Sequence, residues 1–141
     1  MSGHDTDTRI ETDSLGEVQV PKAARWGAQT QRAVDNFPIS GRPLPERFIL
    51  AVVRIKRCAA EANLKLEQLP ADKQAAIVGA CNDLLAGHHL DQFPVDIFQT
   101  GSGTSTNMNV NEAIAHLGAD AGVAIHPNDD VSLGRRRTQT I

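Results

Sequence analysis

One stretch of the sequence restricts the fold more than any other: residues 45–66 have the pattern of a single long amphipathic helix. Their apolar residues recur at alternating four- and three-residue steps, which places them on one side of an α-helix. These residues are Phe48, Val52, Ile55, Ala59, Ala62 and Leu66. Pro45 stands where a first-turn proline is tolerated. We therefore expect a long packed helix whose apolar seam is covered in part by the next helix.

The segment that follows predicts a second helix, antiparallel to the first. It has a proline at its start, Pro70, and an apolar face. That face consists of Ile77, Cys81, Leu84 and Leu85. Gly87 then supplies a residue suited to a helix C-cap. A pair of antiparallel helices is the expected result.

Shorter elements precede and follow this pair. Residues 9–20 contain two β-compatible runs around a Ser-Leu-Gly turn, which predicts a small hairpin or two extended arms, and Pro21 stops the second run. Residues 27–37 predict a short helix that ends before Pro38. Residues 107–117 predict a further helix that starts directly after a loop of glycine, serine and threonine. The sequence thus predicts a mainly α domain with a small β-hairpin.

Composition and charge exclude several classes of function. A chain of 141 residues with 40% hydrophobic residues has room for one domain. A net charge of −3, no tyrosine and only 4% aromatic residues argue against a nucleic-acid partner. The first eight residues are too polar for a secretory signal, and no apolar run approaches the roughly 20 residues of a membrane span. We expect no membrane partner and a cytoplasmic location.

The cysteines and histidines do not predict a metal site. Cys58 and Cys81 lie outside any C-x-x-C spacing and within helix-like apolar patterns, so both are expected to be buried and reduced. His88, His89 and Asp91 could raise the idea of a metal. Adjacent histidines, however, point to different sides of most backbones, and no second cluster lies nearby. A solvated helix end is the preferred interpretation, and we expect no metal and no other cofactor.

Residues 100–106 form a loop of small hydroxyl and glycine residues that opens a helix. Unpaired backbone N–H groups and the helix dipole favour an anion at such a place, and the hydroxyls of Ser102 and Thr104 add donors. A carboxylate or a phosphate fits this loop, but a purely structural capping loop is an equally good interpretation. It is not a P-loop, because no Gly-Lys-Ser/Thr follows, and Asn107 replaces the last glycine of a dinucleotide fingerprint.

A second candidate segment is His126-Pro127-Asn128-Asp129. It could bind an anion through its histidine and asparagine, or it could be an Asx-type turn that caps a following helix. Taken alone, the residues favour the turn.

Two groups of basic residues are interpreted as solvated. Arg54, Lys56 and Arg57 fall on the polar side of the long helix. Residues Arg135, Arg136 and Arg137 lie near the chain end, where three arginines are typical of a solvated tail. Neither group is interpreted as a binding site.

Four blocks of sequence occur in one order and at one spacing. They are R-I-E-T-D-S-L-G-E-V-Q-V-P, W-G-A-Q-T-Q-R-A-V-D-N-F-P-I-S-G, Q-T-G-S-G-T-S-T-N-M-N-V-N-E and H-P-N-D-D-V. Together they resemble class II fumarate hydratase (fumarase), of the fumarase/aspartase superfamily, from about Arg9 to Val131. T-G-S-G-T distinguishes this family from the similar aspartases, which tend to have G-G-A-G-T there.

The resemblance implies a cofactor-free lyase that interconverts fumarate and L-malate in the citric acid cycle. It also implies mostly helical subunits that form homotetramers, with each active site assembled from three chains. Ser102, Gly103 and Thr104 would bind a carboxylate of the substrate. A second dicarboxylate site would consist of His126, Pro127, Asn128 and Asp129. The histidine and serine that act as acid and base lie beyond Ile141 in the family, so no residue here is identified as catalytic.

The resemblance also predicts the organisation of the chain. Residues 1–8 are expected to be a disordered polar tail, and residues 9–131 a fumarase-like amino-terminal lyase domain without the central helical bundle. Residues 132–141 diverge from the family, which has Gln-Ser-Ser-Asn-Asp-Thr where this chain has three arginines, and are expected to be disordered. We expect a truncated fumarase that is inactive alone. The alternatives are a non-enzymatic fragment that docks on intact fumarase and a small anion-binding module.

Overall fold

The computed structural model describes residues 7–99 and 103–132 as a helical domain with one hairpin. Within them lie the strands β1 (Thr8–Asp13) and β2 (Gly16–Pro21) and the helices α1 (Ala28–Asn36), α2 (Glu46–Lys65), α3 (Ala71–Leu85) and α4 (Thr104–Asp120). Two short elements are the 3-10 turn η2 (Leu90–Gln92) and the π-helical turn η3 (Pro127–Val131). The mainly α fold with a small hairpin is thereby confirmed. Most of the predicted tails, 1–8 and 132–141, lies outside the described residues.

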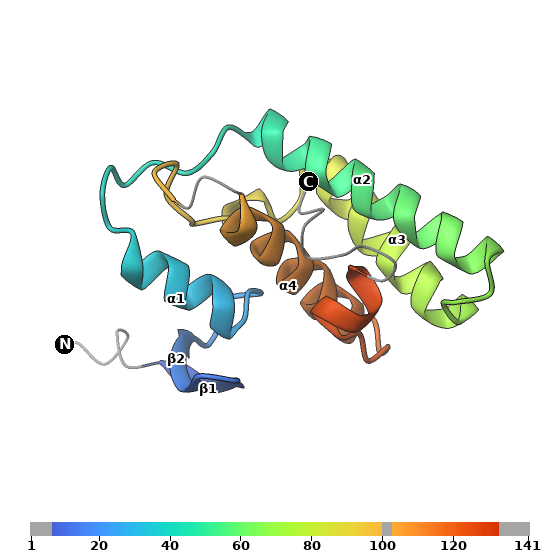
Figure 1. Cartoon of the computed structure of the whole chain (residues 1–141), viewed down its shortest axis with the longest axis horizontal. Coiled ribbons are helices and arrows are strands. Elements are labelled where there is room, and N and C mark those ends of the chain that lie inside the picture. Colours follow the sequence, from blue (N-terminus) through green and yellow to red (C-terminus); the bar gives the residue numbers. More distant parts are fainter. Residues whose placement is uncertain (1–6, 100–102, 133–141) are drawn as a thin grey trace.

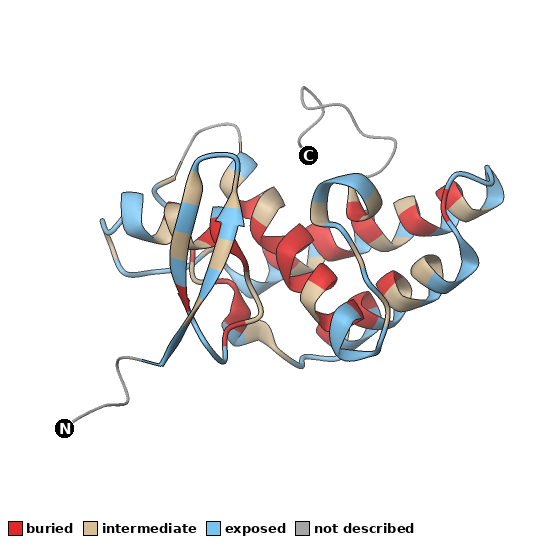
Figure 2. Ribbon diagram, turned by 90° about the horizontal axis from the view of Figure 1, so that it is seen from below, coloured by how far each residue is buried: buried red, intermediate tan, exposed pale blue. Residues whose placement is uncertain are grey.

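Helix α4 occupies the centre of the domain (Figure 1). The antiparallel pair of α2 and α3 packs on it, and α1 and η3 also contact it, with the hairpin beyond α1. Figure 2 shows buried residues gathered where these helices meet, while the hairpin is mostly exposed or half-buried. The core includes Ile49, Val53, Ile77, Leu84, Val110, Ile114 and Leu117. The helices α1, α2 and α3 and the turn η3 therefore all contact α4, and the hairpin is connected to it through α1.

Helix α2 turns a different side to the core from the one that its sequence predicted. Its buried residues are Ile49, Val52, Val53, Lys56, Ala60 and Asn63. Of the predicted seam only Val52 is buried, whereas Phe48, Ile55 and Leu66 are 41%, 37% and 65% exposed. The buried side lies one residue further on, includes the polar Lys56 and Asn63, and meets α3 and α4. The predicted seam is therefore mostly a surface.

Lys56 corrects the interpretation of the basic residues of α2 as a solvated face. Its side chain is 1% exposed, and Nζ donates a hydrogen bond of 2.6 Å to Asn107 Oδ1 at the start of α4. Arg54 is exposed, as predicted, and Arg57 is half-buried and donates to Asn82 Oδ1. The prediction was wrong for Lys56 because a polar partner on α4 offsets the cost of burying an ammonium group.

The hairpin is held in register by its turn and by a partner on α1. Asp13 pairs with Gly16, whose φ of +118° suits glycine, and Leu15 N–H donates to Asp13 Oδ1. Arg32 of α1 donates two hydrogen bonds of 2.9 Å to the Asp13 carboxylate. This bidentate contact lowers the pKa of Asp13. The turn thus points the hairpin toward α1.

The two cysteines occupy different environments. Cys81 is fully buried in the core, and burial raises the pKa of its thiol to about 12. Cys58 is exposed, so the expectation that both thiols are buried was wrong for this residue. Cys58 is exposed because α2 buries a different side from the predicted one, and Cys58 lies on the side that faces solvent.

We predict that only Cys58 reacts with an aromatic disulfide reagent in the native protein, because Cys58 is exposed, whereas burial hides Cys81 and raises the pKa of its thiol. Released chromophore should correspond to one thiol per chain under native conditions and two in denaturant. Cys58→Ser should abolish the native reaction, and Cys81→Ser should leave it intact. Rapid native labelling of both thiols would contradict the burial of Cys81.

The loops before α2 and before α4 are joined through Asp96. Its carboxylate accepts hydrogen bonds from the backbone N–H groups of Ser40, Gly41 and Phe98, at 2.8 to 2.9 Å, and from the Ser40 hydroxyl. Burial of the carboxyl favours its neutral form, but these donors outweigh burial and lower the pKa of Asp96 to about 2. The carboxylate fixes the approach to the loop that opens α4.

We predict that Asp96 makes folding acid-sensitive in a defined range. Because its pKa is depressed in the folded state, its stabilisation is complete above the ordinary value of 3.8 and is lost as pH falls toward about 2. Asp96→Asn should lower the free energy of unfolding at pH 7 and flatten its decline between these two values, measured by urea unfolding at each pH. The matched control is Asp83→Asn, at an exposed position of α3. An unchanged acid slope in Asp96→Asn would contradict the assignment.

Candidate carboxylate-binding site

Helix α4 begins at a glycine with a left-handed backbone. Gly103 has φ +76° and ψ 12° and is the N-cap, and Thr104 is the first helical residue and is exposed. The start of a helix presents unpaired N–H groups and a partial positive charge. The helix begins at Thr104, earlier than the predicted start near Asn107, so Gly103 and Thr104 lie at the helix start itself, a place that suits an anion. Ser102, the third predicted contact, lies outside the described residues.

Gln99 links the two sides of the loop that opens α4. Its Oε1 accepts hydrogen bonds from the backbone N–H and the hydroxyl of Thr106, at 3.0 and 2.7 Å. Its Nε2 donates to the carbonyl oxygen of Asp96 at 2.8 Å. Sequence analysis quoted Gln99 within a motif but gave it no role. Its amide both donates and accepts, and so joins the backbone before the loop, at Asp96, to the first turn of α4, at Thr106.

The second predicted segment forms η3 with a histidine cap. Nδ1 of His126 accepts hydrogen bonds from the N–H groups of Asn128 and Asp129, at 3.1 and 3.0 Å. The N–H of His126 donates to Asp130 Oδ2, which also accepts from Lys73 of α3. The segment is thus a capped turn, as one interpretation held, but the cap comes from the imidazole and not from an Asx side chain. With Nδ1 accepting, the neutral ring carries its proton on Nε2.

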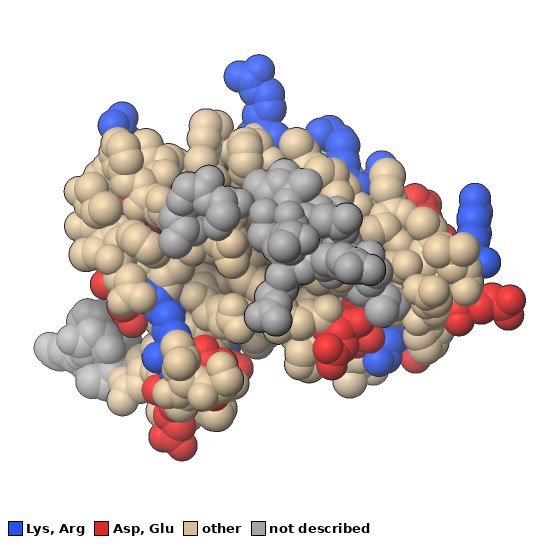
Figure 3. Space-filling view, in the orientation of Figure 1, with Lys and Arg blue, Asp and Glu red and all other residues tan. Residues whose placement is uncertain are grey.

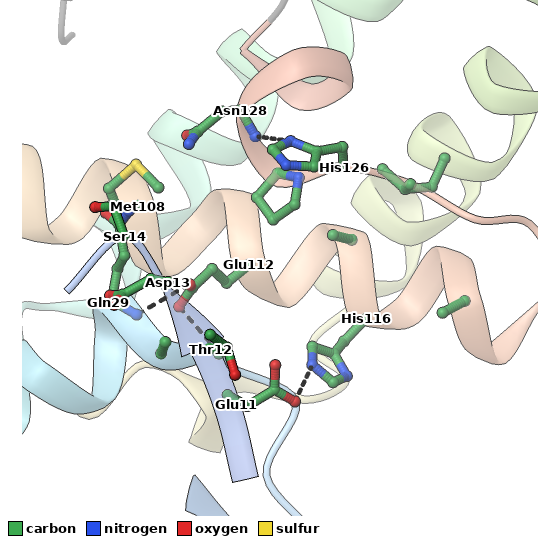
Figure 4. A pocket seen from close by; sticks show the side chains of 16 residues that line it. Glu11, Thr12, Asp13, Ser14, Gln29, Met108, Glu112, His116, His126 and Asn128 are labelled. Carbon is green, nitrogen blue, oxygen red and sulfur yellow. Dashed lines mark hydrogen bonds and ion pairs between the residues drawn. The ribbon is translucent and has the colours of Figure 1, made fainter. Parts of the chain in front are cut away.

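His126, Pro127 and Asn128 line a cleft of about 460 Å³ (Figure 4). Its other described walls are the turn of the hairpin, the start of α1 and the side of α4 that carries Met108 and His116. Gly103 and Thr104 are not among the residues that line it. The structure therefore brings the second predicted site into a cleft and leaves the first at the helix start outside that cleft.

A buried carboxylate stands between α4 and α1 at this cleft. Glu112 of α4 accepts hydrogen bonds from the N–H groups of Gly27, Gln29 and Thr30, at 2.9 to 3.1 Å. It supplies the N-terminal cap that Gly27 cannot provide for α1. A Cβ on Gly27 would lie 2.9 Å from Glu112 Oε2, so a larger residue there would push the carboxylate away from its donors. Sequence analysis missed Glu112, although a carboxylate between apolar helical positions was a usable signal.

The remaining charged groups of the cleft are also paired. Arg9 donates to Glu11 Oε2 at 2.7 Å, and its Nη2 lies 3.2 Å from Nε2 of His116. Because arginine only donates, this ring nitrogen accepts, and the neutral imidazole carries its proton on Nδ1. Burial, and then the charge of Arg9, lower the pKa of His116. Among the described residues that line the cleft, the exposed polar ones are Thr12, Ser14, Gln29, His126 and Asn128.

Charge on the surface does not form a broad basic face in the view of Figure 3. Lys and Arg side chains project mainly from the edge along which α2 runs, and Asp and Glu gather mainly on the opposite edge. The net charge of the chain is −3. Attraction of an anion must therefore come from local donors such as those at the start of α4.

Comparison with known proteins places this arrangement in a family. The family model described as lyase matches residues 16–141. The chain belongs to the lyase family. It is 52% identical over 141 residues to the class II fumarate hydratase of Halobacterium salinarum, covering 96% of this chain and 30% of that protein. The class II fumarate hydratase of Mycobacterium tuberculosis is also 52% identical, over 94% of this chain and 28% of its own length.

A solved structure agrees with these relatives. The class II fumarase of Schistosoma mansoni superposes with a TM-score of 0.86 at 40% identity, covering 90% of this chain and 28% of that one. The resemblance to the amino-terminal part of class II fumarate hydratase, predicted from the four blocks, is thereby confirmed. The chain spans about 30% of the length of the curated relatives it matches.

Two further findings concern only residues 7–99 and 103–132. They contain no cluster of three or more His, Cys, Asp or Glu side chains arranged to hold a metal ion. None of their helices combines the length and the apolar character that crossing a membrane requires.

We predict that Glu112→Gln lowers the free energy of unfolding by about 2 kcal/mol, because hydrogen bonds to a charged group each contribute about 1.5 to 3 kcal/mol and the new amide N–H₂ faces backbone donors. Urea unfolding measures the change. Glu61→Gln, at an exposed position of α2, is the control and should stay within about 0.5 kcal/mol of wild type. Equal stability of the two variants would remove Glu112 from its role as the cap of α1.

Proposed function

We propose that this chain is the amino-terminal part of a class II fumarate hydratase and binds one carboxylate of fumarate or L-malate at the start of α4. The observation that carries the proposal is the identity of 52% to enzymes of that name along almost the whole chain. The helix start at Gly103 and Thr104 supports it, since backbone N–H groups there suit a carboxylate. Ser102, Gly103 and Thr104 are the proposed contacts.

The chemistry explains why a carboxylate needs such donors. Dehydration of malate removes a proton from C3, and the carbanion spreads its charge into the neighbouring carboxylate. Donors fixed in place before the reaction stabilise that charge. In the family the acid and base are a histidine and a serine outside the stretch matched here. We therefore assign this chain a binding role and no catalytic residue.

The other implied properties remain part of the proposal. The cleft with His126, Pro127 and Asn128 would be the second dicarboxylate site, together with Asp129, whose N–H donates to the His126 imidazole. The enzyme would need no cofactor, would be cytoplasmic, and would assemble as a homotetramer in which several chains complete each site.

A second candidate function is an interaction fragment that docks on intact fumarase. One observation favours it: Phe48, Ile55 and Leu66 form an exposed apolar stripe on α2. Turnover by a mixture of this chain and intact fumarase cannot separate the two candidate functions, but ligand binding by the pure chain can.

We predict that L-malate shifts the amide signals of Gly103 to Thr106 in NMR titrations, with an affinity on the order of millimolar, because two hydrogen bonds to a charged group barely exceed the cost of immobilising a ligand. Thr104→Ala should erase the shift, and Thr8→Ala on β1 should preserve it. The pure chain should also show no hydration of fumarate when the absorbance of fumarate is followed over time.

Sulfate and added salt provide the control for the three arginines near the chain end. Signal shifts caused only by attraction of malate to those arginines would appear equally with sulfate and would shrink as salt is added. If saturating malate leaves the start of α4 unmoved, the proposed site does not function in this chain. Robust turnover would instead show that groups within this chain supply the acid and base.

A further inference from the structure

Three segments that are distant in sequence meet at one buried ammonium group. Lys56 comes from the middle of α2, Asn107 from the first turn of α4, and Ser132 directly follows η3. Nζ of Lys56 donates to Asn107 Oδ1 at 2.6 Å and to Ser132 Oγ at 3.3 Å. Asn111, one turn further along α4, donates to the same Ser132 hydroxyl at 2.7 Å. The four side chains form one polar cluster, here called the Lys56 cluster.

The Lys56 cluster touches both segments to which a carboxylate site is assigned. Asn107 lies three residues after Thr104, and its N–H donates to the carbonyl oxygen of Gly103 at 3.0 Å. Ser132 is the C-cap of η3, whose N-cap is His126. A displacement of Lys56 would therefore act on the start of α4 and on η3 together.

We propose that Lys56 is a positioning residue, which holds the carboxylate-binding start of α4 and the His126 turn in one fixed relative arrangement. This inference rests on the proposed function, because that function gives the two segments their ligand. Lys56 itself has no assigned contact with substrate. Its ammonium acts on Asn107 and on the Ser132 hydroxyl, and through them on the backbone of each segment.

The burial of Lys56 favours positioning over a contribution to stability. At 1% exposure the ammonium has lost nearly all its water, a cost that an apolar side chain of similar size would avoid. Val52, Val53 and Ala60 line the same side of α2. A methionine at position 56 would find an apolar environment there. What it would lose is the directional contact with two segments at once.

The first test needs no ligand. Lys56→Met in the full chain should shift the backbone and side-chain NMR signals of both Asn107 and Ser132, while its urea midpoint stays close to wild type. Arg54→Met, at an exposed position of the same helix, is the matched control and should shift neither. Ser132→Ala in the wild-type background should move the Lys56 ammonium signal. Shifts confined to one of the two segments would overturn the proposal.

The second test adds L-malate and follows the amides of Thr104 and Asn128. Lys56→Met should weaken the affinity for L-malate, measured at both amides, by on the order of tenfold. The reason is that a site which has lost its supporting side chain binds less tightly even when every direct contact with the ligand remains. If wild type responds and Lys56→Met responds equally, positioning is refuted while the proposed function stands. If wild type does not respond, the proposed function fails, and the ligand-free spectra still decide whether Lys56 joins the two segments. A large loss of stability in Lys56→Met, with unchanged signals at Asn107 and Ser132, would assign the lysine to packing instead.

Discussion

The domain depends on buried and half-buried polar side chains that project from α4. Each ties the helix to a different part of the chain, and Glu112 makes the strongest of these contacts because its carboxylate accepts from three backbone N–H groups at the N-cap and first turn of α1. Thr106 binds Gln99, Asn107 binds Lys56, Asn109 binds the carbonyl oxygen of Gln92, and Asn111 binds Ser132. An apolar helix in this place would pack but would leave these segments free to slide.

The hairpin is attached by the same kind of contact. The guanidinium of Arg9 donates to the carbonyl oxygens of Pro21, Ala24 and Trp26, at 2.6 to 2.9 Å, and so holds the chain between β2 and α1. It also meets His116 of α4. Arg9 is half-buried, and its several donors reach carbonyl oxygens that come from different turns of the chain. The network therefore restricts the domain to one arrangement of its elements.

Sequence analysis located most elements but not the side that α2 buries. Helix starts and ends followed from proline, glycine and apolar spacing, which are local. The side of α2 that is buried combines Ile49, Val53 and Ala60 with two polar residues, so local spacing favours the purely apolar side instead. Packing against α3 and α4 decides which side turns inward, and Asn107 accepts a hydrogen bond from Lys56 on that side. The errors about Lys56 and Cys58 have this single cause.

At the candidate site, too, residues within local motifs could be picked out from the sequence, whereas residues whose contacts come from distant segments could not. The motifs located Thr104 and His126, because glycine-rich helix starts and His-Pro turns are recognisable in sequence. Gln99 received no role and Lys56 was wrongly interpreted as solvated, since their contacts exist only when other segments are in place.

The contacts that orient the start of α4 and η3 are internal to the chain. Gln99 holds the loop before α4, Lys56 joins that helix to the residue after η3, and the imidazole of His126 closes the turn. If the proposed function holds, donors held in this way would need little reorganisation when a carboxylate arrives, so the cost of binding would be mainly that of immobilising the ligand. The affinity of this chain would then be limited by how many donors it can aim at one carboxylate, and additional donors from other segments or chains would add to a site that is already oriented.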